Sequence, residues 1–313
     1  MKIKRIVSLF LALVLALSAV AVLGSCKKSE KGITVQIGPN PETLDPALNS
    51  AVDGGNMLIT LFETLLIIDQ DNKVQPGQAE SYTVSPDGLT WTFTMRDGLK
   101  WSDGTELNAK DFEYTMKRIA NPDVGAPYGE TVVGMIEGYQ DAIGNPDKNG
   151  KKTTKPDIDK LNVKASEDGK TLTIKLAYPC SYFDKIVAFG TMSPVQKATV
   201  EKNGDKWATK PETDVCNGPY MISEWTPGER IVCKKNPNYK GGWDNSKIVT
   251  EQLTFLLLED SSASYAAYQL WAYHRGHLAK PRCKGDSSHG YRKVLFALMD
   301  VRCRDLSDLP AFV

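Results

Sequence analysis

The strongest constraint on the fold is a strand–turn–strand pattern in residues 82–95. Tyr82 and Val84 precede the turn sequence Ser85-Pro86-Asp87-Gly88, in which proline and glycine supply the backbone angles that a tight turn needs. From Leu89 to Met95 apolar side chains then alternate with threonines. A period of two is typical of a strand with one buried face. We therefore expect two antiparallel strands here.

Further strands and helices are predicted on both sides of this pattern. The expected strands are Ile33–Gly38, Leu172–Tyr178, Arg230–Lys235 and Gln252–Leu258. The expected helices are one that carries Met57 to Leu65 and is capped by Asp53 or Asn56, one that begins at Asn108 with Asp111 in a capping box, one near Val195–Asn203, and one that begins at Asp260. A polar, lysine-rich segment, residues 144–156, is expected to be a surface loop. Because strands and helices do not alternate strictly, the fold class is α/β or mixed α+β.

The formal net charge of zero is the sum of three unlike parts. Residues 1–25 carry three basic side chains and no acidic one, residues 26–269 carry 27 basic and 34 acidic ones, and residues 270–313 carry eight basic and four acidic ones. Binding to nucleic acid needs a concentrated positive field. Since the long central part is acidic, no nucleic-acid partner is expected.

The N-terminus has the pattern of an export signal. Three basic residues in positions 2–5 precede an apolar run from Ile6 to Leu23, and small residues follow it, as in a secretory signal peptide of residues 1–25. The sequence Leu23-Gly24-Ser25-Cys26 is similar to a bacterial lipobox. This predicts that Cys26 is lipidated and anchors the chain to the extracytoplasmic face of the bacterial cell membrane.

The alternative is an uncleaved apolar helix that stays in the membrane, because eighteen residues nearly suffice to span it. On the lipoprotein interpretation, residues 26–32 form a short tether. Export also places the other cysteines in an oxidising or exposed environment. Cys180, Cys216 and Cys233 either include one disulfide pair or are buried thiols, and their spacing does not decide between the two.

Motifs for catalysis and for metal binding are absent from the sequence. No phosphate-binding loop, nucleophile elbow or zinc-protease motif occurs. All histidines lie near the C-terminus, at His274, His277 and His289, so the body has no imidazole base or metal ligand. We therefore expect no enzyme, no cofactor and no metal site.

A series of short segments resembles one known family. In chain order they are Leu44–Pro46, Leu61–Leu66, Pro76–Tyr82, Ser85–Gly98, Lys100–Gly104, Asn108–Phe112, Met192–Pro194, Asn217–Tyr220 and Asn236–Tyr239. Together they resemble the oligopeptide-binding lipoproteins of peptide ABC importers, the family 5 extracellular solute-binding proteins. The resemblance extends over residues 33–269.

The resemblance implies a periplasmic-binding-protein-like type II fold whose two lobes close on a peptide. It implies a first-lobe core formed by residues 33–62 and 197–269, and a smaller inserted domain formed by residues 63–196. It further implies a monomer whose partners are peptides and an ABC permease. Another cargo of the same family (a nickel chelate, haem or an oligosaccharide) and a surface lipoprotein without a transport role are the alternatives.

The resemblance implies that four residues of this chain bind the ligand. Relatives use the backbone of the stretch shortly after the Leu-Asp-Pro motif, which here is Ser50, Ala51 and Val52. Relatives often have an acidic residue at the first of these positions, where this chain has serine. Tyr128 matches an aromatic residue that contacts the peptide.

The C-terminal residues 270–313 depart from the family pattern. Residues 26–269 contain 24 lysines and 3 arginines, whereas residues 270–313 contain 3 lysines, 5 arginines and every histidine. We interpret this tail as an aberrant segment, most simply a frameshifted reading, and the second lobe as missing; a small divergent domain is the alternative. A chain with one lobe is expected to bind peptides poorly or not at all.

Overall fold

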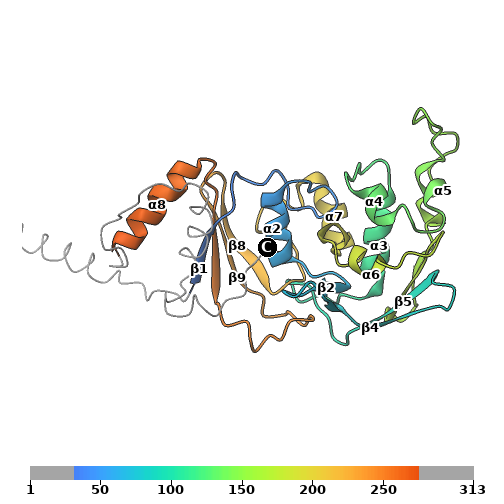
Figure 1. Cartoon of the computed structure of the whole chain (residues 1–313), viewed down its shortest axis with the longest axis horizontal. Coiled ribbons are helices and arrows are strands. Elements are labelled where there is room, and N and C mark those ends of the chain that lie inside the picture. The colour runs from blue at the N-terminus through green and yellow to red at the C-terminus, as the bar shows by residue number, and fades with distance from the viewer. Residues whose placement is uncertain (1–31, 275–313) are drawn as a thin grey trace, which may run out of the picture.

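The computed structural model of the chain describes residues 32–274. The described part is elongated and mixed α/β, with one sheet toward each end and helices between and above them (Figure 1). The predicted signal peptide, Cys26 and most of the predicted tail lie outside the described residues. Among residues 32–274, no helix is both long and apolar enough to cross a bilayer.

The first sheet contains the first and the last strand of the described chain. Its strands, in spatial order, are β1 (Gly32–Gln36), β10 (Gln252–Leu256), β9 (Arg230–Lys235) and β8 (Tyr220–Thr226). β1 is parallel to β10, and the other neighbours are antiparallel. The predicted strand Arg230–Lys235 is confirmed, but two others are shorter than expected. The first ends at Gln36, because Gly38 has a φ of 112° that turns the chain, and the last ends at Leu256.

The second sheet is antiparallel and contains the predicted hairpin. Its strands, in spatial order, are β4 (Ala79–Val84), β5 (Thr90–Met95), β7 (Thr171–Lys175) and β6 (Val163–Ala165); a separate two-stranded hairpin consists of β2 (Leu66–Ile68) and β3 (Val74–Pro76). The hairpin turn is closed by hydrogen bonds from Gly88 N–H to Ser85 O (2.8 Å) and from Ser85 N–H to Thr90 O (2.9 Å). Tyr178, expected on a buried strand face, is 56% exposed, because β7 ends at Lys175.

The helices are short, apart from three. They are α2 (Val52–Leu61), α3 (Ala109–Ala120), α4 (Gly129–Val133), α5 (Tyr139–Ile143), α6 (Phe183–Ile186), α7 (Lys197–Asn203) and α8 (Ser261–His274), with 3₁₀ turns η1 (Ile158–Lys160), η2 (Gly190–Met192) and η3 (Gly204–Lys206). The predicted capping box of α3 is confirmed: Lys110 N–H donates to Asn108 Oδ1 (3.0 Å), and Asn108 N–H donates to Asp111 Oδ2 (2.9 Å). These bonds satisfy amide groups that a helix start leaves free.

The prediction for α2 was wrong at both ends. Its N-cap is Ala51, without a side-chain cap, instead of Asp53 or Asn56. It ends at Leu61 although the helical spacing of apolar residues continues to Leu65. The reason is long-range: Gly218 N–H donates to Leu61 O (2.7 Å), and the side chain of Asn217 accepts the N–H of Glu63 (3.0 Å). These bonds replace the next turn of the helix.

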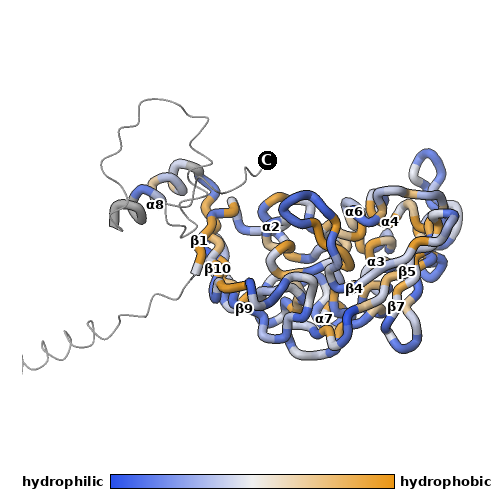
Figure 2. Tube along the Cα trace, turned by 60° about the horizontal axis from the view of Figure 1, so that its bottom comes forward, coloured by the Kyte–Doolittle hydropathy of each residue, from blue (hydrophilic) through white to orange (hydrophobic). Residues whose placement is uncertain are grey.

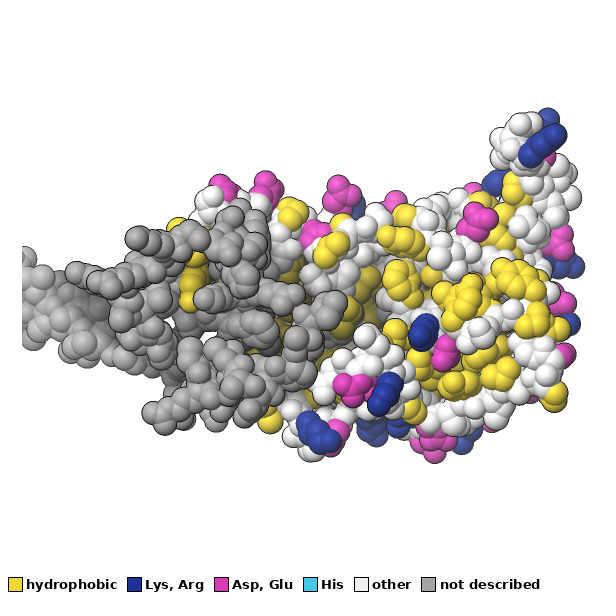
Figure 3. Space-filling model, in the orientation of Figure 1, with side chains coloured by type: hydrophobic (Ala, Val, Ile, Leu, Met, Phe, Trp, Pro, Cys, Tyr) yellow, Lys and Arg dark blue, Asp and Glu magenta, His cyan; other side chains and the backbone are white. Residues whose placement is uncertain are grey.

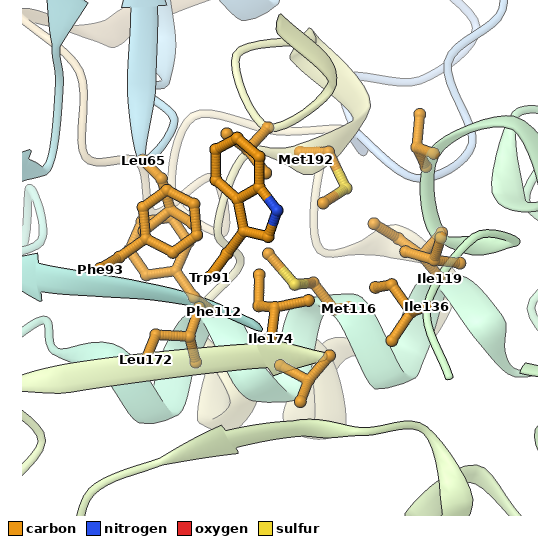
Figure 4. Close-up of a cluster of buried hydrophobic side chains, with 14 of the residues drawn as sticks. Leu65, Trp91, Phe93, Phe112, Met116, Ile119, Ile136, Leu172, Ile174 and Met192 are labelled. Atoms are coloured by element: carbon orange, nitrogen blue, oxygen red, sulfur yellow. The ribbon is translucent and has the colours of Figure 1, made fainter. Parts of the chain in front are cut away.

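Two clusters of buried apolar side chains form the interior. One lies between the second sheet and α3, where Phe93 and Ile174 of the strands face Phe112 and Met116 of the helix (Figure 4). The other lies between α2 and the first sheet and includes Met57. Figure 2 shows apolar segments along the strands and inner helices, and hydrophilic loops at the periphery. Two buried residues pack outside the cluster expected from the predicted domains. Ala47, from the segment 33–62, packs in the first cluster, and Val195, from the segment 63–196, packs in the second. The division into the domains 33–62 with 197–269 and 63–196 stays a prediction.

The segment of residues 144–156 forms a loop that projects beyond α5 (Figure 1). Residues 147–155 are all exposed, as expected from their polarity. The loop carries basic side chains at its tip (Figure 3). Lys148, Lys151 and Lys152 form no ion pair within the described part of the chain.

Candidate functional site

A pocket of about 520 Å³ lies beside α2, β2 and α6, which are neighbours near the middle of the molecule (Figure 1). All four residues predicted to bind ligand line it: Ser50, Ala51, Val52 and Tyr128. The structure therefore brings together residues that are 76 or more positions apart in the sequence. Their contact with a ligand stays a prediction.

Most of the pocket wall is apolar. Several of its large hydrophobic side chains are exposed, and exposed apolar side chains that gather in one place are typical of a binding site: Val52, Ile59, Ile68, Phe189 and Trp243. Hydrophobic side chains also gather on the face of the molecule seen in Figure 3. Phe189 and Trp243 were not predicted, since no local pattern in the sequence marks them.

The segment Asn49–Val52, here called the 49–52 loop, has a fixed shape. Asn49 N–H donates to Asp45 O (2.9 Å), and its side-chain amide donates to Ala51 O (3.1 Å). The carboxamide lies where a Cβ of residue 54 would stand, with Asn49 Oδ1 only 2.0 Å from that position, so a larger residue at Gly54 would displace the Asn49 side chain from its bond to Ala51 O. Gly55 N–H donates to the same Ala51 carbonyl (2.9 Å).

Three of the four backbone N–H groups of this loop are free within the described part of the chain. Within residues 32–274, no acceptor takes the backbone N–H of Ser50, Ala51 or Val52. Ala51 is extended (φ −104°, ψ 150°), and Val52 begins a helix that has no side-chain cap. Free N–H groups in an exposed, extended segment can bond to the carbonyl groups of an extended chain laid beside it.

Tyr128 is held at the pocket wall by an aromatic neighbour. It precedes α4, and its carbonyl accepts the N–H of Val132 (3.0 Å). Its ring lies edge-on to Phe189, with centroids 5.6 Å apart and planes at 81°, a favourable geometry for two aromatic rings. The side chain is 36% exposed and thus available to a ligand.

Glu63 also lines the pocket and is held in place by several hydrogen bonds. Its carboxylate accepts hydrogen bonds from Gln78 Nε2 (2.8 Å), from Gly242 N–H (2.7 Å) and from the hydroxyl of Tyr239. The hydroxyl oxygen of Tyr239 in turn accepts a hydrogen bond from the backbone N–H of Trp243 (3.0 Å). Burial raises the pKa of Glu63, while these donors act in the opposite direction. The network therefore positions the chain segment that carries Trp243.

A sequence model of the "Bacterial extracellular solute-binding proteins, family 5 Middle" matches residues 73–270. The chain belongs to this family. It is a family of solute-binding proteins and not of enzymes, and its members are extracellular by description.

Individual relatives agree with this assignment. The chain is 39% identical over 233 residues to the periplasmic oligopeptide-binding protein OppA of Salmonella typhimurium, covering 74% of this chain and 40% of the relative. It is 33% identical to the probable deoxycholate-binding periplasmic protein YgiS of Escherichia coli, covering 74% of this chain and 41% of the relative. The crystal structure of Haemophilus influenzae OppA in complex with RPPGFSPFR matches with a TM-score of 0.67 and 31% identity, covering 80% of this chain and 45% of that one.

These solute-binding proteins are longer than the present chain. The chain spans about two fifths of the length of the two curated relatives and somewhat less than half of the solved one. Its fold is that of the matching part of the oligopeptide-binding structures. The mixed α/β class expected from the sequence is confirmed.

Other buried reactive groups of this family 5 protein lie outside the pocket. Cys180, Cys216 and Cys233 are all buried and free, so the alternative of a disulfide pair among them does not apply. Asp214 is buried near Cys216 and Cys233. Among the described residues, no group of three or more histidine, cysteine, aspartate or glutamate side chains could hold a metal ion. The predicted lipidation site, Cys26, lies outside the described residues.

Proposed function

We propose that the chain is part of an extracytoplasmic receptor that captures peptides for an ABC importer. The pocket beside the 49–52 loop would form one wall of the peptide site. The observation that carries this proposal is the row of free N–H groups at Ser50, Ala51 and Val52 beside an apolar pocket. A peptide laid beside the loop as an extended strand would bond to those of these donors that face it, because successive N–H groups of an extended backbone point to opposite sides. Its side chains would meet an apolar wall with little specificity for particular side chains.

The remaining parts of the proposal concern location and partners. Lipidation of Cys26 would hold the protein at the outer face of the membrane, where an ABC permease would accept the peptide from a monomeric receptor. Residues 33–62 with 197–269 would form the core of one lobe, and residues 63–196 its inserted domain. We expect the 313-residue chain to bind peptides more weakly than the micromolar range.

A second candidate is an amphipathic anion as cargo. The relative YgiS is named as probably deoxycholate-binding, and the exposed apolar side chains of the pocket wall would suit a steroid as well as a peptide. A nickel chelate, haem, an oligosaccharide or a role without transport lack a supporting observation of this kind.

The test uses a substitution that removes one N–H group and little else. Val52→Pro places proline at the first position of α2, where the N–H has no acceptor within the helix and proline is well tolerated. The extended conformation of Ala51 suits a residue before proline. If Val52 N–H bonds to the ligand, the dissociation constant for di- to hexapeptides rises about threefold or more, measured by saturation-transfer NMR, which detects weak binding.

The matched control is Val52→Ala, which keeps the N–H and trims a side chain that is 81% exposed. It should bind peptides more tightly than Val52→Pro, because it retains the N–H group. Deoxycholate serves as a second ligand in the same experiment. Saturation transfer to deoxycholate but to no peptide would reject the peptide proposal in favour of the second candidate. Equal peptide affinity of Val52→Pro and Val52→Ala would reject the role of the Val52 N–H.

A further inference from the structure

The pocket wall contains two charged side chains among its described residues, and only one of them is available to a ligand. These are Glu63 and Lys185. Glu63 is 3% exposed, and both its oxygens accept hydrogen bonds from the protein. A carboxylate with this number of internal donors has little capacity left for a ligand. The charge that the pocket presents is therefore that of Lys185.

The ammonium group of Lys185 has no partner within residues 32–274. The neighbouring Asp184 does not line the pocket, and its Oδ1 accepts the backbone N–H of Lys185 (2.8 Å). Other exposed lysines, such as Lys148, are also unpaired, but among the described residues Lys185 is the only lysine that lines the pocket. Lys185 thus leaves one positive charge uncompensated beside an apolar wall.

We propose that Lys185 selects ligands by binding a carboxylate of the peptide, a step that rests on the proposed peptide function. The ligand class would be peptides with an acidic group next to apolar side chains. The apolar part would cover Tyr128 and Phe189, whose rings line the same pocket, and the carboxylate would reach the ammonium group. Covering an ion pair with ligand lowers its contact with water and strengthens it relative to an open surface pair.

The carboxylate could come from an acidic side chain or from the C-terminus, and three tetrapeptides distinguish these sources. The first has a glutamate beside phenylalanine and an amidated C-terminus. The second has glutamine in place of glutamate and a free C-terminus. The third has glutamine and an amidated C-terminus, and therefore no carboxylate. Dissociation constants are measured by ligand-observed NMR for the 313-residue chain and for Lys185→Met, which keeps an apolar stem but no charge.

The expected result is that the parent chain binds one or both acidic peptides roughly three to ten times more tightly than the third peptide. Lys185→Met should lose this preference and still bind the third peptide within about twofold of the parent chain, because its apolar contacts remain. Lys148→Met, a substitution in the projecting loop outside the pocket, should keep the preference. Raising the salt concentration should weaken it.

Three outcomes would overturn the inference, and they are distinguishable. Equal binding of all three peptides, or a preference that survives in Lys185→Met, would mean that Lys185 is an ordinary solvated lysine while peptide binding itself stands. Absence of binding for all three peptides even at millimolar concentration, where the weak affinity proposed for this chain is detectable, would overturn both this inference and the proposed function.

Discussion

Asp45 and Arg118 form a buried ion pair across 73 positions of the sequence. The guanidinium donates from Nη1 to Asp45 Oδ1 (2.9 Å) and from Nη2 to Asp45 Oδ2 (2.5 Å), and the two side chains are 3% and 11% exposed. Trp207 Nε1 also donates to Asp45 Oδ2 (2.9 Å). Asp45 thus joins α3 and the segment after η3 to the chain that leads into the 49–52 loop.

Loss of one partner of this pair should destabilise the fold strongly. Arg118→Met removes the charge and keeps an apolar side chain, which leaves the carboxylate of Asp45 buried with fewer donors. We expect the free energy of unfolding to fall by about 3 kcal/mol, since an uncompensated buried charge is costly. Urea unfolding followed by circular dichroism measures this change.

The control for Arg118→Met is an exposed pair. Lys170 and Asp97 lie 3.6 Å apart, with side chains 66% and 93% exposed, so Lys170→Met should cost less than about 1 kcal/mol. The double variant Asp45→Asn with Arg118→Met should regain part of the lost stability, because no charge remains unpaired. Equal effects of Arg118→Met and Lys170→Met would contradict the role assigned to the pair.

The hydroxyl of Tyr239 should determine where Trp243 lies. Tyr239→Phe removes a donor to Glu63 and the acceptor of the Trp243 N–H, so we expect a loss of about 1 to 3 kcal/mol in stability. The pocket wall should also change. Labelling with fluorotryptophan and fluorine NMR would detect this as a shift of the Trp243 signal, which Trp243→Phe assigns.

Tyr178→Phe is the matched control, since Tyr178 is exposed and its hydroxyl has no hydrogen bond within the described residues. It should alter neither stability nor the Trp243 signal. An unchanged Trp243 signal in Tyr239→Phe would show that the Glu63 network does not position this part of the wall.

Elements that depend on neighbouring residues could be predicted from the sequence. The capping box of Asn108 and Asp111 and the turn at Ser85 to Gly88 are set by contacts over a few positions, and both were predicted correctly. The end of α2 could not be predicted in the same way. Asn217 and Gly218 take over the hydrogen bonds at its last turn, and nothing near Leu61 in the sequence indicates them.

The same distinction holds for the pocket. The 49–52 loop and Tyr128 were found through the resemblance to a family, whereas Phe189, Lys185 and Trp243 come from segments that only the tertiary structure brings to the wall. Trp243 follows the predicted landmark Asn236–Tyr239 closely, and it reaches the pocket because Tyr239 and Gly242 both bond to Glu63. No spacing in the sequence encodes that contact.

Asp214 should make the stability of the protein fall as the pH rises. It is buried, neither carboxylate oxygen has a hydrogen-bond partner within the described residues, and burial raises its pKa from 3.8 to about 7. Between about pH 4 and pH 7 the unfolded state has therefore lost the proton that the folded state keeps. Rising pH then favours the unfolded state, and the effect levels off above pH 7.

Asp214→Asn removes this titration, so the variant should gain stability over the parent chain as the pH rises from about 4 to 7. The difference should reach roughly 2 to 4 kcal/mol, from a shift of about 3 pKa units at 1.36 kcal/mol each. Urea unfolding of both proteins at several pH values measures it, and the subtraction cancels other groups such as Asp111. If the stability difference between Asp214→Asn and the parent chain did not change with pH, the carboxyl group of Asp214 would have to be exposed or hydrogen-bonded.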